Sequence, residues 1–273
     1  MNGMGKTLNI LWLWPDILNQ HGERGNAMAL VRVCGLYGIE TEVARVNRLE
    51  DELSVEAADI ILIGAGELAV MPQIVGALSK HVKRLADWVE GGGILFATGT
   101  AGAALGVQTL RTDGSQISGL GLLDMECRER EAVLGDDLIF SIGGGNGDVT
   151  DGCLVGGNGS DPGGGLGIYC IQIQMMDVSL AAGQQPLGRI IYGYGNNGSG
   201  FEGAQNGGVI FTNALGPVLV KNPWLTLSLI RNALKRKPCM ESDELRFNPK
   251  LFELELASAK AIRAFNQSKE KPK

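Results

Sequence analysis

The chain has 273 residues, a formal net charge of -6 and a sequence pI near 5.1, a length that suits one large domain or one domain with additions. The acidic balance argues against a nucleic-acid-binding surface, because phosphate binding requires a basic face. The five cysteines are scattered without CxxC spacing, so we expect neither a disulfide framework nor a metal site, and we expect a reduced, cytoplasmic location.

The N-terminal half alternates short aliphatic runs with segments of helical period, which is typical of parallel strands joined by helices. Strands are predicted near 8–13, 41–46, 59–63 and 93–98, and helices near 24–37, 72–90 and 101–107. Pro72 suits the first turn of the helix 72–90, and the glycines at 91–93 suit its end. Glu67 and Pro72 interrupt the apolar stretch 60–78, so no transmembrane segment is predicted there.

The second half is divided by a glycine-rich segment, 143–167, which has few large apolar residues and is expected to be a surface insertion or flexible loop. Further strands are predicted near 168–174, 188–193 and 208–213. Asn222 is predicted to cap a helix over 224–235. Residues 1–237 are therefore expected to form the main domain, and 238–273 a helical extension with one helix near 250–265 and a charged tail.

Several glycine-rich blocks carry a resemblance to a known family. They are Pro186-Leu187-Gly188, Gly193 to Gly198, Glu202-Gly203 and Gly216 to Pro223, preceded by the motif Asp16 to Asn26. From about Leu11 to Leu234 the chain resembles class I glutamine amidotransferases of the cobyric-acid-synthase-like branch, in particular the glutaminase subunit of lipid II isoglutaminyl synthase. The resemblance implies a three-layer, flavodoxin-like α/β fold with a mainly parallel central sheet and added β segments. It implies glutamine hydrolysis and amide transfer without a cofactor, and as partner a Mur-ligase-like ATP-dependent synthetase that amidates lipid II.

The family's nucleophilic cysteine lies on a sharp strand-to-helix turn that reads roughly Cys-Gly-Gly-Tyr-Gln-Leu-Leu-Gly. In this chain the nucleophile position falls on Thr98 or Gly99. Neither residue is a thiol, and Thr98 or Thr100 is expected to supply a helix-capping hydroxyl. By the same resemblance, the pocket and oxyanion positions are Gly64, Gly66, Gly99 and Thr100, and the pocket scaffold is Asn196, Asn197 and Gly198.

The catalytic histidine is missing as well. Its position falls at Gln174, and a later histidine-containing block, Tyr-Leu-His-Gly-Pro, reads Asn213 to Pro217 in this chain. His21 and His81 are expected to lie away from the catalytic position, with His81 on the solvent face of a helix. The sequence therefore predicts a degenerate glutaminase-like subunit. Two alternatives are an active glutaminase with a relocated nucleophile, Cys127 or Cys170, and a protein that binds a ligand in the old glutamine pocket without turnover.

Overall fold

The computed structural model describes residues 7–142, 167–237 and 245–269. Its centre is a six-stranded sheet with the order β11-β12-β4-β3-β1-β2. The strands are β1 (Thr7–Leu13), β2 (Glu40–Val46), β3 (Ile60–Ile63), β4 (Ile94–Thr98), β11 (Ala204–Asn206) and β12 (Val209–Thr212). All neighbours pair in parallel except β11 with β12. The parallel part has the 2-1-3-4-5 order of flavodoxin-like folds, so the predicted fold class is confirmed.

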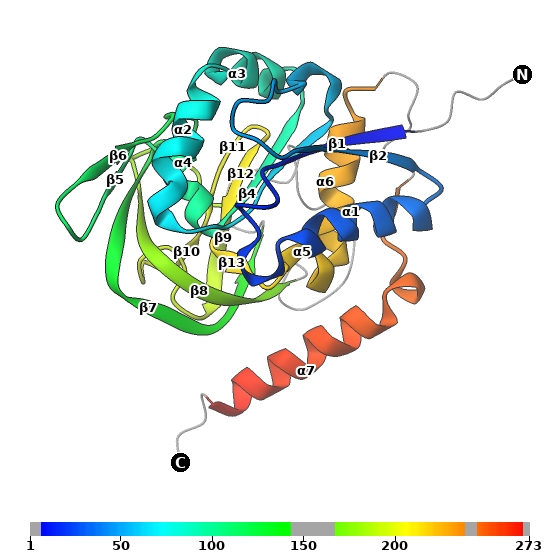
Figure 1. Ribbon diagram of the computed structural model, residues 1–273. Helices are drawn as coiled ribbons and strands as arrows, with labels where there is room; N and C mark the ends of the chain where they lie inside the picture. The colour runs from blue at the N-terminus through cyan, green and yellow to red at the C-terminus, as the bar shows by residue number, and fades with distance from the viewer. Residues whose placement is uncertain (1–6, 143–166, 238–244, 270–273) are drawn as a thin grey trace, which may run out of the picture.

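Helices cover both faces of this sheet (Figure 1). They are α1 (Arg24–Leu36), α5 (Val218–Lys221) and α6 (Pro223–Leu234) on one side, and α2 (Met71–Ser79), α3 (Val82–Glu90) and α4 (Gly102–Leu105) on the other. Alternate strand residues divide between the two cores: Trp12 and Phe96 pack with the first group, Leu13 and Ala97 with the second. Burial on both faces explains the uninterrupted apolar runs in the sequence.

Three local predictions are wrong. The predicted helix 72–90 is divided into α2 and α3. His81 lies at their junction and not on the solvent face of a helix, because its side chain is buried with ring Nδ1 3.2 Å from Arg84 Nη1. Asn222 precedes α6, but its side chain makes no cap. Its Oδ1 accepts from Tyr169 N at 2.8 Å and its Nδ2 donates to Tyr169 O at 2.9 Å, because the buried backbone of the neighbouring strand also requires hydrogen-bond partners.

A second, largely antiparallel sheet lies beside the first. Its strands are β5 (Gln108–Leu110), β6 (Gln116–Ser118), β7 (Met125–Ser141), β8 (Gly167–Leu180), β9 (Gly188–Tyr192), β10 (Phe201–Glu202) and β13 (Ala214–Leu215). The sequence patterns indicated β8 and β9 but missed β7, whose pairing with β8 shifts register between Glu129 and Leu134. Ser141 pairs with Gly167. Of the predicted glycine-rich segment, all but Gly167 lies outside the described residues.

The described C-terminal part contains α7 (Glu253–Lys269), which confirms that a helix occupies the predicted region. Figure 1 shows it as a long helix beyond α5. Phe252 and Ala259 are buried in the same core as α1 and α6. Among the described helices, none has the length and hydropathy needed to cross a bilayer.

Candidate functional site

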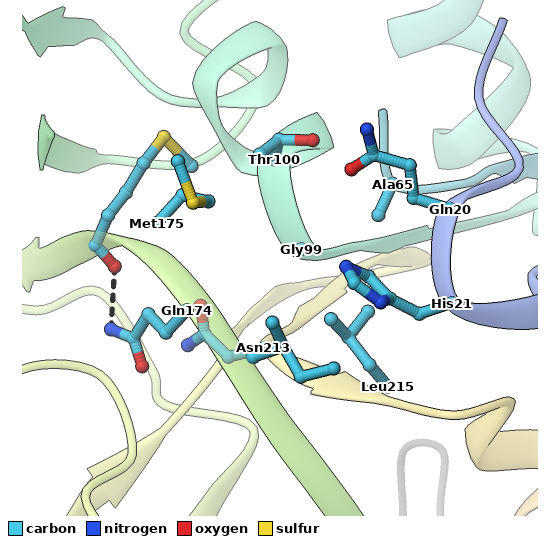
Figure 2. A pocket seen from close by; sticks show the side chains of 11 residues that line it. Gln20, His21, Ala65, Gly99, Thr100, Gln174, Met175, Asn213 and Leu215 are labelled. Atoms are coloured by element: carbon cyan, nitrogen blue, oxygen red, sulfur yellow. Dashed lines mark hydrogen bonds between the residues drawn. The ribbon is translucent and has the colours of Figure 1, made fainter. Parts of the chain in front are cut away.

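A cavity lies beyond the carboxyl end of β4, at the edge where open α/β sheets hold their sites. Figure 2 shows that its wall combines the turn after β4, the loop after β3, the segment after β1 and one stretch of β8. The lining residues are Gln20, His21, Ala65, Gly99, Thr100, Ile173, Gln174, Met175, Met176, Asn213 and Leu215. The cavity volume is about 20 Å³, which is enough for a water molecule and not for a glutamine side chain.

The turn after β4 distinguishes the two candidate nucleophile positions. Thr98 has extended backbone angles (φ -127°, ψ 147°), is buried, and its hydroxyl donates to Glu23 Oε2 at 2.7 Å. Gly99 has φ +54° and borders the cavity. A Cβ atom placed on Gly99 would lie 3.0 Å from Ala65 Cβ and 3.3 Å from Leu215 Cδ2. A side chain at position 99 would thus enter the cavity, while the side chain of Thr98 faces away from it.

Thr100 is hydrogen-bonded to the loop that follows β3. Its hydroxyl donates to Gly66 O at 2.7 Å and accepts from Gly66 N at 2.9 Å. The predicted helix-capping role of Thr98 or Thr100 is wrong, because neither hydroxyl caps the helical turn and both have partners on other segments. The Gly66 N–H is already bonded and is therefore not available to an oxyanion. Gly64 borders a second, smaller cavity instead.

Gln174, at the predicted histidine position, lines the cavity but is a buried structural amide. Its Nε2 donates to Asn196 O at 2.9 Å and to Met176 O at 2.6 Å, and its Oε1 accepts from Gln172. A neutral amide with all these bonds made cannot take up a proton from a nucleophile.

Of the three residues predicted as pocket scaffold, Asn196 contacts the cavity wall through Asn213. Asn196 is buried, and its Oδ1 accepts from the cavity residue Asn213 at 2.9 Å. Asn213 in turn donates through its backbone N–H to Glu202 Oε1 at 2.6 Å, and burial raises the pKa of the Glu202 carboxyl. Asn197 and Gly198 belong to the adjoining turn and do not line the cavity.

His21 is in the cavity wall, contrary to the expectation that it lies elsewhere. Figure 2 shows its ring on the same side as Leu215, facing the turn at Gly99. Its φ of +58° is uncommon for a residue with a side chain. Residue spacing could not indicate this position, because the segment after β1 reaches the cavity only through the fold of the whole sheet.

Glu23 is a buried acid that sequence reasoning did not single out. Its side chain borders the smaller cavity, of about 10 Å³, and its Oε1 has no hydrogen-bond partner. Burial raises the pKa of Glu23 to about 7, against the lowering effect of hydrogen bonds from Thr98 and Asn26. The sequence signal was its place in the motif Asp16 to Asn26.

The cysteines proposed as relocated nucleophiles lie away from the cavity. Cys127 and Cys170 are 3 % and 1 % exposed. Burial raises the pKa of Cys127 to about 12 and that of Cys170 well above its ordinary value. Because the thiolate is the nucleophile, both thiols are inert at neutral pH.

The flavodoxin-like sheet, the added antiparallel sheet and the cavity at a strand-to-helix turn agree with the predicted class I glutamine-amidotransferase-like fold. The chain is 25% identical over 233 residues to the lipid II isoglutaminyl synthase (glutamine-hydrolyzing) subunit GatD of Streptococcus pneumoniae, covering 84% of this chain and 82% of the relative. It is 28% identical over 233 residues to the subunit of the same name from Staphylococcus aureus, covering 84% and 86%. These similarities confirm the resemblance seen in the sequence.

Comparisons of structures and family models give less detail. The structure of PurLQS from Thermotoga maritima superposes with a TM-score of 0.51 at 13% identity, over 84% of this chain and 98% of that chain. At this identity the likeness concerns the fold alone. No protein-family model matches the chain.

Proposed function

We propose that this protein is a glutaminase-like subunit that no longer hydrolyses glutamine and that acts with a Mur-ligase-like ATP-dependent synthetase in the amidation of lipid II. The observation that supports the loss of hydrolysis is the closeness of Leu215 to the space that a side chain at position 99 would occupy. Gly99 has no side chain, and Leu215 lies beside the space that a side chain there would enter. In this proposal Gly99 takes the place of the family's nucleophile.

Two observations support that assignment. Counting back from Leu105-Gly106, which match the end of the family turn, places the cysteine at residue 99. The positive φ of Gly99 suits a nucleophile on a sharp strand-to-helix turn. The histidine of the later block corresponds to Leu215, so neither position 99 nor position 215 carries a thiol or an imidazole.

Two other groups at the site are also unsuited to the reaction. A class I glutaminase needs a thiolate, a base and free N–H groups for the oxyanion. In this chain the Gly66 N–H is bonded to Thr100, and Gln174 is an amide with its bonds made. The burial of Cys127 and Cys170 argues against an active glutaminase with a relocated nucleophile.

In this proposal the subunit stabilises or regulates its synthetase. The complex then depends on free ammonia in place of glutamine. The relatives support this pathway, since both are named as subunits of lipid II isoglutaminyl synthase. A cytoplasmic location is part of the proposal and rests on the cysteine pattern.

The test is release of ammonia and glutamate from glutamine, by the purified protein alone and with a co-expressed Mur-ligase-like synthetase. We expect background rates in both cases, because loss of a true nucleophile costs about 10⁴- to 10⁶-fold in rate. Robust turnover that is lost in Cys127→Ala or Cys170→Ala would overturn the proposal. Co-purification with the synthetase supports the assigned partner, and failure to form a complex contradicts it.

A further inference from the structure

The start of α1 is hydrogen-bonded to one wall of the cavity, the wall formed by the turn that contains Gly99. Glu23 Oε2 accepts from the Thr98 hydroxyl at 2.7 Å and from Asn26 Nδ2 at 2.9 Å. Thr98 is the last residue of β4 and immediately precedes Gly99. The position of Glu23 therefore restrains the start of the turn 98–100.

The same helical turn is tied to the opposite wall. Asn26 Oδ1 accepts from Leu219 N at 2.9 Å. This N–H belongs to the first turn of α5, where backbone donors have no partner within the helix. Gly25 lies so close to Pro217 that a Cβ atom there would overlap the proline ring. The segment 213–217, which contains Leu215, is thus held against α1.

We propose that Glu23 and Asn26 are positioning residues that set the separation between the two cavity walls, the turn 98–100 and the segment 213–217. The inference rests on the proposed function only in taking this cavity as the site. It gives the N-terminal motif a physical role, because Glu23 contacts Thr98 in one wall and Gly25 lies against Pro217 in the other. Asn26 bonds to Leu219, in the helix that directly follows the second wall.

The protonation state of the Glu23 carboxyl should affect this arrangement. Burial raises the pKa of Glu23 to about 7, so the carboxyl changes charge near neutrality. The other residues around its cavity are Trp12, Asn26, Leu62, Ile63, Gly64, Phe96 and Thr98, none of them charged. Arg24 follows Glu23 in the chain and Arg45 lies over the ring of Trp12, but among the described residues neither forms an ion pair with Glu23. Hydration of the ionised carboxylate therefore favours separation of the surrounding segments. The spacing of the walls should therefore change around pH 7.

A cysteine at position 99 provides a reporter in the cavity. Gly99→Cys is introduced together with Cys153→Ser and Cys239→Ser, while Cys34, Cys127 and Cys170 are buried. Its rate of alkylation by iodoacetamide is measured from pH 6 to pH 9, with Glu23 intact and with Glu23→Gln, Asn26→Ala or Asp59→Asn. The last change is the matched control, a buried carboxyl replaced by its amide at the amino end of β3, the opposite edge of the sheet.

With Glu23 intact, we expect the alkylation rate to show an inflection near pH 7, separate from the one caused by ionisation of the thiol. The inflection near pH 7 should be absent in Glu23→Gln. Asn26→Ala should change the rate at least threefold, while Asp59→Asn leaves the profile unchanged. Identical profiles for Glu23 and Glu23→Gln, or equal effects of Asn26→Ala and Asp59→Asn, would overturn the inference. Alkylation needs no glutamine chemistry, so these results are independent of the glutaminase assay.

Discussion

Replacing Glu23 by glutamine should change how the free energy of unfolding depends on pH. The carboxyl is 3 % exposed, and its pKa is raised from 4.5 to about 7 by burial. A group whose pKa is higher in the folded state favours folding when it is protonated. Its favourable effect is therefore complete below pH 4.5 and is lost as the pH rises to about 7.

The size of the effect follows from the two pKa values. The difference between 4.5 and about 7, at about 1.4 kcal/mol for each pKa unit, corresponds to about 3 kcal/mol above pH 7. Glutamine keeps an oxygen that accepts from Thr98 and Asn26, but places N–H groups where Oε1 has no partner. The cost of those unsatisfied donors, about 1 to 3 kcal/mol, does not vary with pH.

The assay is urea unfolding of the wild-type and Glu23→Gln proteins at pH 5, 6, 7 and 8. Other titrating groups contribute equally to both proteins, so the difference between the two curves isolates Glu23. The variant should gain about 2.5 kcal/mol relative to the wild type between pH 5 and pH 8. A constant difference over this range would refute the reasoning, since it would mean that the pKa of Glu23 is the same in the folded and unfolded states.

Two further substitutions test the structure elsewhere. Asp59→Asn removes the charge that pairs with Lys237 Nζ at 2.6 Å and should lower the free energy of unfolding by about 2 kcal/mol, because the lysine is only partly exposed. Thermal and urea unfolding measure this, and an unchanged midpoint would contradict it. Gly25→Ala gains about 1 kcal/mol in helix propensity but overlaps Pro217, at a cost of about 1 to 3 kcal/mol. A net loss of about 1 kcal/mol is expected, and a more stable variant would show that α1 and the 213–217 segment can move apart freely.

The sequence by itself determined the central architecture. Strands buried on both faces need continuous apolar runs, and Ile60–Ile63 and Ile94–Ala97 show them. That Thr98, Gly99 and Gln174 carry neither a thiol nor an imidazole is likewise visible in the residues alone, because folding cannot supply a missing functional group. The long strand β7 was missed because polar residues and a register shift interrupt its alternation.

Tertiary structure alone decided how the site is arranged. Successive residues of a strand face opposite sides, and only the structure shows that Gly99 borders the main cavity while Thr98 borders the smaller one. His21 reaches the same cavity through a turn with positive φ. Burial raises the pKa of Glu23, and the hydrogen bond from Thr98, 75 positions away along the chain, lowers it. These properties arise from long-range contacts and desolvation, which local sequence patterns do not encode.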